Sequence, residues 1–305
     1  MQIKFSDKSK VKEKYLRFIK SQEIKGELFK DKINQFEKYY VPLCGMIFQG
    51  YSKKKGTRII GLAGSQGSGK STISNILKII LKEGFNLNTI FISIDDFYKT
   101  LKMRQLMSKK TNNLFLTRGV PGTHDTKILL SCLKKLKDRT FKQFAIPKFD
   151  KSNDDRFPRR KWVKIIKKPD VVIFEGWCVG AKPQKKKDLL RPINELERLK
   201  DKNLKWRTKV NQELKKNYSK IFNLIDETIF LKAPSFKFVY KWRLLQEKKL
   251  KATTKGKKIM TKKELKNFIM FYERITKHMI KSSPKNLKSV ITIDDKHRLK
   301  SIKFI

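Results

Sequence analysis

The sequence predicts an α/β fold in which helices flank a mostly parallel sheet. Short apolar runs that are typical of buried strands recur along the 305 residues. Segments whose apolar residues follow helical spacing separate these runs. A glycine-rich loop, GSQGSGKS at 64–71, joins the first run to the helix that follows it. Strands that alternate with helices in this way favour a parallel sheet covered on both faces.

The predicted strands are short aliphatic runs that end at polar or acidic residues. The principal runs are 58–63, 88–94, 170–177, 227–234 and 289–293. Two further strand-like segments, around 141–149 and 161–166, flank a charged loop. We expect the principal runs to be buried strands of one sheet.

Helices are predicted between these strands. Residues 71–84 follow the glycine-rich loop, with Gly84 as the stop signal. A polar loop then extends to about 124, and Asp125 is placed to cap a helix over 125–136. The later predicted helices are 236–250 and 263–280, separated by a loop at 251–258.

Two further helical segments are expected outside this alternation. Residues 10–50 show helical spacing, and we assign 1–55 as an N-terminal helical extension. The remaining residues, 56–305, are predicted to form one α/β domain. Within that domain the lysine-rich stretch 181–220 is predicted to be a helical insertion.

The net charge of +47 is extreme and has two interpretations. Nucleic-acid binding is one, because lysine and arginine release counterions from a phosphate backbone. An AT-rich coding bias is the other, because 61 of the 75 basic residues are lysine, only 14 are arginine and alanine is scarce. The lysines are also spread along the chain. We favour the second interpretation and expect no specific nucleic-acid partner.

Three cysteines, Cys44, Cys132 and Cys178, form no CxxC pair. Their odd number and spacing fit a reducing compartment and offer no zinc site. No run of about 18 apolar residues is present, so we expect no membrane span. The lysine-rich N-terminus lacks an apolar signal core. A cytoplasmic location is therefore expected.

The glycine-rich loop satisfies the phosphate-binding pattern G-x4-G-K-[ST]. Its glycines allow backbone N–H groups to turn toward phosphate oxygens, and the next helix adds its positive N-terminal end. Lys70 is expected to reach the β- and γ-phosphates of ATP, and Ser71 to hold Mg²⁺. The predicted nucleotide-binding residues are Gly64, Ser65, Gln66, Gly67, Ser68, Gly69, Lys70, Ser71 and Thr72.

Acidic residues end two of the other predicted strands. Asp95 and Asp96 follow one strand, and Glu175 ends another. Ligands bind beyond the carboxyl ends of strands in open α/β sheets. A kinase needs one carboxylate to accept the acceptor's proton and another to hold hydrated Mg²⁺. We assign Asp95 as the base and Glu175 to the metal, and Asp96 is open to either role.

Two motifs resemble one group of P-loop kinases. SIDDFY at 93–98 and VVIFEGW at 171–177 resemble the metabolite kinases that include uridine kinase, phosphoribulokinase and pantothenate kinase. Further stretches narrow the resemblance to the D-glycerate 3-kinases of cyanobacteria and plants, over about 57–295. They are RGVPGTHD at 118–125, IPKFDKSNDDR at 146–156, WRTKVNQELKKNY at 206–218 and LKAPSFKFVYKWRLLQEKKL at 231–250.

The resemblance implies a P-loop kinase domain over 56–305 that uses ATP and Mg²⁺ to convert D-glycerate to 3-phosphoglycerate. By position it implies catalytic roles for Lys70, Asp95 and Glu175, and a lid role for Arg243 over the transferring phosphate. The implied acceptor-binding residues are Asp96, Tyr98, Arg118, Thr123, His124, Asp125, Asp150, Lys151 and Arg156. The segment 152–160 has fewer glycines than the resemblance leads us to expect.

Simpler structural roles remain open for several of these residues. Asp125 is placed to cap a helix, and Arg243 is placed to pair with Glu247 four residues later. The alternative interpretation of His124 is a packed loop residue. For Lys151 and Arg156 the alternative is a solvated charge on the surface.

Two functional alternatives also remain. A kinase of the same fold would act on a nucleoside, a pantothenate-like acid or a sugar phosphate. A nucleic-acid-binding NTPase would instead explain the charge, although no zinc-finger or RNA-recognition motif is present.

Overall fold

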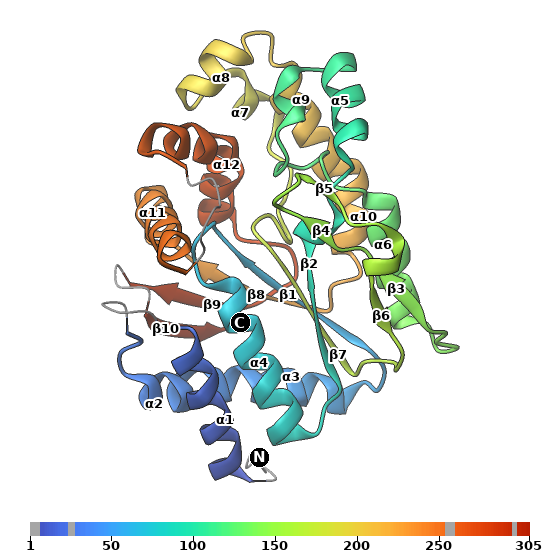
Figure 1. The fold of residues 1–305 in the computed structure, drawn as a ribbon, viewed down its shortest axis with the longest axis vertical. Coiled ribbons are helices and arrows are strands. Elements are labelled where there is room, and N and C mark those ends of the chain that lie inside the picture. Colours follow the sequence, from blue (N-terminus) through green and yellow to red (C-terminus); the bar gives the residue numbers. More distant parts are fainter. Residues whose placement is uncertain (1–6, 24–27, 254–259, 295–297) are drawn as a thin grey trace.

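The computed structural model describes residues 7–23, 28–253, 260–294 and 298–305. Within these residues the main sheet has six strands, and all but one of them run parallel (Figure 1). In their order across the sheet they are β10 (Leu299–Phe304), β9 (Leu287–Ile293), β8 (Glu227–Lys232), β1 (Arg58–Gly64), β7 (Val171–Gly176) and β2 (Thr89–Ser93). Helices cover both faces, so the predicted fold class is confirmed.

Alternate residues of β1 enter two different cores. Ile59 and Ala63 pack on the face covered by α6 (Thr126–Lys137) and α12 (Lys262–Ser282). Ile60 and Leu62 pack on the opposite face, which α4 (Lys70–Phe85) covers. Burial on both faces explains why this strand is an uninterrupted apolar run in the sequence.

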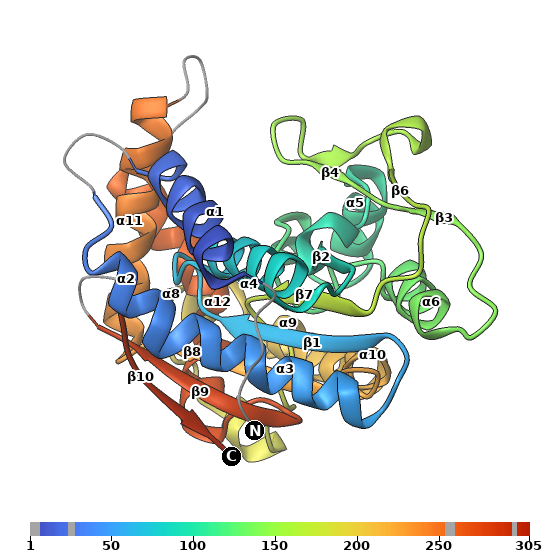
Figure 2. The same cartoon turned by 90° about the horizontal axis from the view of Figure 1, so that it is seen from below.

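Most of the described N-terminal segment is helical, as predicted. Its helices are α1 (Lys8–Ser21), α2 (Lys32–Gln35) and α3 (Val41–Lys53), with a π-helical turn at 36–40 before α3. Tyr15 and Leu43 share one core with α4 and the sheet. Figure 2 shows α1 and α3 beside α4. These helices therefore buttress the helix that follows the phosphate loop.

Two local predictions about helices were wrong. The predicted polar loop before 124 contains α5 (Leu101–Lys110) and a 3-10 turn at 113–116. Most of α5 is exposed and its one buried residue is Arg104, so it lacks the apolar stripe that predicts a helix. The helix α4 also passes through Gly84 and ends where Asn86 adopts a left-handed conformation at φ 51°.

The last strand, β10, was not predicted. It runs antiparallel to β9 at the edge of the sheet, and most of its side chains are exposed. Leu299 is its one buried residue, so the segment has no apolar run. The predicted loop at 251–258 does not begin at 251, because α11 (Phe236–Thr253) extends to Thr253; residues 254–258 lie outside the described residues.

Two small hairpins stand beyond the β2 edge of the sheet (Figure 2). One pairs β3 (Phe144–Ile146) with β6 (Val163–Ile165), where strand-like segments were expected. The other pairs β4 (Phe149–Asp150) with β5 (Asp155–Arg156). The second hairpin carries the segment that we expected to hold the acceptor.

The stretch 181–220 is largely helical, as predicted. It contains α7 (Lys186–Leu190), α8 (Glu195–Lys200), α9 (Lys205–Glu213), a π-helical turn at 214–218 and the start of α10 (Ser219–Phe222). In Figure 1 these helices, except α10, gather with α5 at the end of the molecule opposite α1–α3. Arg274 of α12 donates to both carboxylate oxygens of Glu197, at 2.6 and 2.7 Å. Both side chains are at most 8% exposed.

We expect Arg274→Ala to lower the free energy of unfolding by about 3–5 kcal/mol, because it leaves the Glu197 charge buried without its partner. Urea denaturation measures this loss. Arg198→Ala is the matched control, since it breaks an exposed 3.9 Å pair with Glu195 and should cost at most about 1 kcal/mol. Equal losses in the two variants would contradict the expectation.

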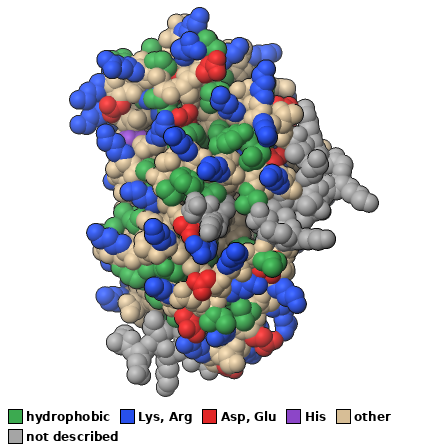
Figure 3. All heavy atoms as spheres, turned by 90° about the vertical axis from the view of Figure 1, so that its left-hand side faces the viewer, with side chains coloured by type: hydrophobic (Ala, Val, Ile, Leu, Met, Phe, Trp, Pro, Cys, Tyr) green, Lys and Arg blue, Asp and Glu red, His purple; other side chains and the backbone are tan. Residues whose placement is uncertain are grey.

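On the face drawn in Figure 3, the basic side chains are scattered and form no single patch. Lysine and arginine there are interspersed with acidic and apolar side chains. This distribution on one face agrees with the coding-bias interpretation of the charge. None of the described helices combines the length and hydrophobicity that a bilayer crossing requires.

Candidate active site

Three adjacent strands of the sheet end at the candidate site. β7 lies between β1 and β2, and Glu175 is level with Leu62 on one side and Ser93 on the other. The phosphate loop follows β1, and Asp95 follows β2 in a short 3-10 turn. Because these strands are parallel, the loop and both predicted acids lie at the carboxyl end of the sheet.

The phosphate loop is held in shape by its own hydrogen bonds. Lys70 Nζ donates to the Ser65 carbonyl oxygen at 2.8 Å, and Ser68 Oγ donates to the same oxygen at 2.8 Å. Gly67 and Gly69 have φ of +74° and +84°, which residues other than glycine rarely adopt. Ser71 and Thr72 lie in the first turn of α4, whose N-terminal end carries partial positive charge. This geometry suits an anion.

Helix α11 lies directly against the loop. A Cβ atom added to Gly67 would approach the Trp242 backbone to 2.9 Å. Arg243 is the next residue, and its guanidinium pairs with Glu247 at 2.5 Å and lies 5.7 Å from the centre of the Phe268 ring. The expected structural pairing of Arg243 is therefore present, and the residue is also next to the loop.

Lys70, Asp95 and Glu175 are coupled electrostatically. Burial lowers the pKa of Lys70, while the Glu175 and Asp95 carboxylates oppose that shift. Burial raises the pKa of Glu175, while Lys70 opposes the shift. Ser93 Oγ donates to Glu175 Oε1 at 2.8 Å, and Oε2 is buried without a partner among the described residues.

Asp95 is arranged to remain ionised. Tyr98 Oη donates to its Oδ1 at 2.9 Å, and Lys151 Nζ lies 3.4 Å from Oδ2. Burial alone would raise the pKa of Asp95, but the Lys151 and Lys70 cations and the Tyr98 hydrogen bond are among the influences that bring it below the ordinary value. The group is therefore a carboxylate at neutral pH, as a proton acceptor must be.

The β4–β5 hairpin is fixed to the 3-10 turn by Asp96. Its carboxylate accepts from Lys148 Nζ at 3.1 Å and from the Phe149 backbone N–H at 3.3 Å. Asp150 accepts from the Ser152 and Asn153 backbone N–H groups and so closes its own turn. Asp96 therefore attaches the hairpin to the 3-10 turn that carries Asp95.

Arg118 and Arg104 both pair with the carboxylate of Asp154. Asp154 pairs with Arg118 and also accepts from Arg104, which is fully buried, at 2.9 Å. Arg104 further donates to the backbone oxygens of Leu116 and Asp154, at 2.5 Å each. Asp154 has φ +52°, a conformation that glycine favours, and its carboxylate contacts help to stabilise it there. This network positions Arg118 beside the hairpin.

The RGVPGTHD segment is packed inside the protein. Thr123 Oγ1 accepts from Gly119 N–H at 3.0 Å and donates to the Val120 carbonyl at 2.7 Å, so it stabilises its own turn. His124 is buried, and burial lowers its pKa to about 4. His124 is therefore neutral at pH 7.

Asp125 and Arg156 combine a structural role with a position near Tyr98. Asp125 accepts from Ile128 N–H at 3.2 Å, so it caps α6 as predicted. Arg156 donates to the Tyr98 carbonyl at 2.8 Å and to Asp125 Oδ2 at 3.3 Å. The Arg156 side chain is only 10% exposed, so the solvated interpretation does not hold for it. Lys151, which is 66% exposed, does fit that interpretation.

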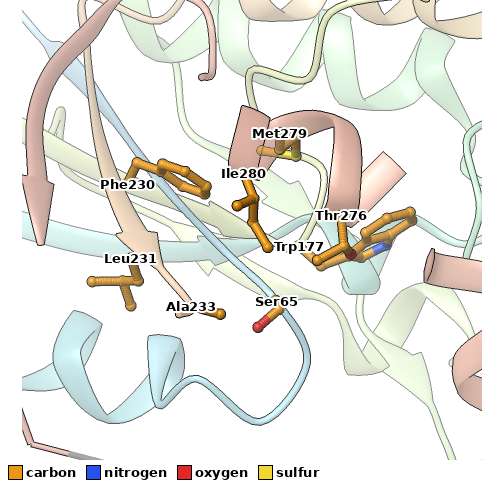
Figure 4. A pocket seen from close by; sticks show the side chains of 8 residues that line it. All are labelled: Ser65, Trp177, Phe230, Leu231, Ala233, Thr276, Met279 and Ile280. Atoms are coloured by element: carbon orange, nitrogen blue, oxygen red, sulfur yellow. The ribbon is translucent and has the colours of Figure 1, made fainter. Parts of the chain in front are cut away.

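A small cavity lies behind the phosphate loop. It has a volume of about 10 Å³, and Ser65, Trp177 and Thr276 are among the residues that line it (Figure 4). Ser65 Oγ and Thr276 Oγ1 are buried and have no partner in the described part of the chain. The space is about the size of a single water molecule and is too small for a substrate.

Comparison with known proteins identifies the family. A model described as "Phosphoribulokinase / Uridine kinase family" matches residues 59–239, which is more than half of the chain. The chain belongs to this family. It is therefore a P-loop kinase, a class of phosphotransferase that uses ATP and typically Mg²⁺.

Relatives within this family differ in how much of their length matches. The protein named "Uncharacterized kinase mug58" of Schizosaccharomyces pombe is 36% identical over 223 residues, which are 70% of this chain and 78% of that protein. The chloroplastic D-glycerate 3-kinase of Arabidopsis thaliana is 29% identical over 223 residues, which are 70% of this chain and only 46% of that enzyme.

A solved structure of D-glycerate 3-kinase from Cryptococcus neoformans var. grubii resembles this P-loop kinase with a TM-score of 0.74. The match covers 87% of this chain and 99% of that chain, at 24% sequence identity. At this identity the similarity demonstrates the shared fold.

The residues near the P-loop fit a magnesium ion. Glu175 Oε2 is a buried oxygen without a partner among the described residues, and Ser71 is an exposed hydroxyl at the start of α4. The described residues contain no cluster of three or more His, Cys, Asp or Glu side chains arranged for a metal. Kinases need no such cluster, because Mg²⁺ is held by substrate phosphates and one or two protein oxygens. Ser71 and Glu175 are the residues suited to this role.

Sequence reasoning missed several residues of this kinase site. Ser93 bonds Glu175, Arg104 and Asp154 hold Arg118, and Tyr218 bonds His124. Ser93 and Asp154 lie inside motifs that were recognised, so their polarity was a signal. Tyr218 also ends a recognised motif, WRTKVNQELKKNY, but its partner His124 is 94 positions away, so the sequence did not reveal their contact. Arg104 lies outside every recognised motif and gave no signal.

Proposed function

We propose that this P-loop kinase transfers the γ-phosphate of ATP to the 3-hydroxyl of D-glycerate. The observation that carries the proposal is the environment of Asp95, an ionised carboxylate at the end of β2, coupled electrostatically to the P-loop lysine. Arg118 lies 5.4 Å from the centre of the Phe149 ring, which contacts the Tyr98 ring, and Arg156 donates to the Tyr98 carbonyl. Cations next to a proton acceptor suit a substrate that carries both a carboxylate and a hydroxyl.

In the proposed reaction Asp95 takes the proton of the acceptor hydroxyl as its oxygen attacks the γ-phosphate in line. Lys70 stabilises the negative charge that develops on the phosphate oxygens. Arg243 contributes to the same stabilisation once it releases Glu247 and contacts the phosphate instead. When bound, Mg²⁺ neutralises phosphate charge, with Ser71 and Glu175 as its proposed protein ligands.

The acceptor-side residues have proposed roles that follow from their partners. Arg118 and Arg156 bind the carboxylate of glycerate, and Asp125 accepts from a glycerate hydroxyl. Asp96 and Asp150 shape the hairpin, and Lys151 adjusts the charge at Asp95. The three cysteines are free and buried, which fits the proposed cytoplasmic setting.

An acceptor panel tests the proposal. The protein is incubated with ATP, Mg²⁺ and one acceptor at a time: D-glycerate, a nucleoside, pantothenate or a sugar phosphate. We expect D-glycerate to give the highest kcat/KM, and product analysis to identify 3-phosphoglycerate rather than the 2-phosphate. Absence of turnover with D-glycerate would overturn the proposal. Stimulation of ATP hydrolysis by RNA or DNA would instead support the nucleic-acid alternative.

A further inference from the structure

Tyr218, in the insertion, reaches the site and contacts His124. It lies in the π-helical turn at 214–218, and its side chain is fully buried. Its Oη accepts a hydrogen bond from the Gly122 backbone N–H at 3.1 Å. The same Oη lies 2.5 Å from His124 Nδ1. The insertion is therefore joined to the RGVPGTHD segment by one phenol.

The hydrogen bonds of this phenol determine where the His124 proton sits. Tyr218 has one hydroxyl hydrogen, and the described residues offer it no acceptor other than His124 Nδ1. If Nδ1 carried the proton, the tyrosine hydroxyl would have no acceptor, which is costly in a buried site. The arrangement that satisfies both groups has Tyr218 Oη–H donating to Nδ1. The single proton of the neutral imidazole then lies on Nε2.

The Nε2–H group produced in this way has no protein partner in the described part of the chain, although it is buried. His124 is 1% exposed, and its ring stacks on Tyr98 with centroids 4.4 Å apart. Tyr98 in turn donates to Asp95, so the ring lies one side chain away from the proton acceptor. A buried donor beside the reaction centre that lacks a protein partner is suited to bind a ligand oxygen.

We propose that His124 Nε2–H donates a neutral hydrogen bond to an oxygen of the phosphate acceptor, and that Tyr218 positions this proton. The inference rests on the proposed function in one respect, namely that the acceptor is an oxygen-bearing small molecule. The Nε2–H group can bind a ligand oxygen that has a lone pair. A ligand group that can only donate hydrogen bonds cannot bind at this position. The insertion thus contributes to acceptor recognition without contacting the acceptor itself.

The tautomer is tested first, without any substrate. The chain contains three histidines, so ¹⁵N-histidine labelling gives a spectrum that His124→Gln and His278→Gln variants can assign. We expect His124 to be neutral, with Nε2 protonated and Nδ1 unprotonated. A protonated Nδ1 in the wild-type protein would overturn the inference, whatever the acceptor proves to be.

Tyr218→Phe then tests the positioning role. We expect the variant to lose the single-tautomer spectrum of His124 and to show an about ten-fold rise in the KM of the acceptor. The Kd of ATP should stay within about two-fold, because the P-loop is unchanged. Tyr39→Phe is the matched control, since it removes a buried hydroxyl that bonds the Lys300 carbonyl at 2.7 Å near the C-terminal strand.

The two readouts separate this inference from the proposed function. If D-glycerate is inactive, the kinetic arm uses the best acceptor of the panel, and the spectrum is still decisive. An unchanged acceptor KM in Tyr218→Phe, with the control also unchanged, would overturn the positioning role. An equal rise in both variants would show a general packing effect and would overturn it as well.

Discussion

Asp95→Asn is expected to leave ATP binding intact while reducing phosphoryl transfer by about 10²–10⁴-fold. An amide has the shape of the carboxylate and can still accept from Tyr98, but it cannot take a proton from the acceptor hydroxyl. Lys70 and its bond to Ser65 do not depend on this side chain. Single-turnover transfer to D-glycerate and a fluorescent-nucleotide Kd for ATP measure the two quantities separately.

Asp138→Asn provides the matched control for Asp95→Asn. Asp138 follows the last turn of α6, at the opposite end from Asp125, and it bonds Thr140. We expect its transfer rate to equal that of the wild type. Loss of ATP binding in Asp95→Asn, or a near wild-type transfer rate, would contradict the role of Asp95 as the base.

Lys70→Ala is expected to reduce kcat by about 10²–10³-fold and to weaken ATP binding as well. Lys70 is the cation of the P-loop, and its amine donates to the Ser65 carbonyl within that loop. Removing it eliminates charge stabilisation that grows as the γ-phosphate is transferred. Steady-state kinetics with varied ATP give kcat and KM, and their ratio reports the total loss.

Lys78→Ala is the matched control for Lys70→Ala. Lys78 lies on the same helix, α4, and its side chain is exposed. Its removal changes the net charge by the same amount, so it reveals any effect of the overall positive field on ATP binding. If the two variants lost activity equally, the lysine of the P-loop would have no special role.

The sheet was predictable because its strands carry strong local signals. β1 and β7 are buried on both faces, so residues 59–63 and 171–174 are unbroken apolar runs in the sequence. The edge strand β10 and the exposed helix α5 lack such signals, because most of their side chains face solvent. Helix α5 is held by the hydrogen bonds of Arg104 to distant loops, and no local pattern reveals those bonds.

The candidate site was predictable only where one stretch of chain specifies it. The P-loop from Gly64 to Ser71 is a continuous motif, and Asp125 caps the helix that it precedes. His124 shows the limit of this reasoning. Its motif indicated a polar site residue, but its neutral state arises from burial, and its partner Tyr218 is 94 positions away.

The sequence by itself determined the order of the principal strands and of most helices, the phosphate loop and the identity of the acids at the strand ends. These features depend on spacing and backbone conformation within a few residues. Only the tertiary structure decided which charges are paired, as Arg243 is with Glu247 and Arg118 with Asp154. It also decided protonation, through the burial of His124 and the cations around Asp95. Coulombic and desolvation effects depend on distance in space, and folding brings together residues whose separation in sequence carries no information about that distance.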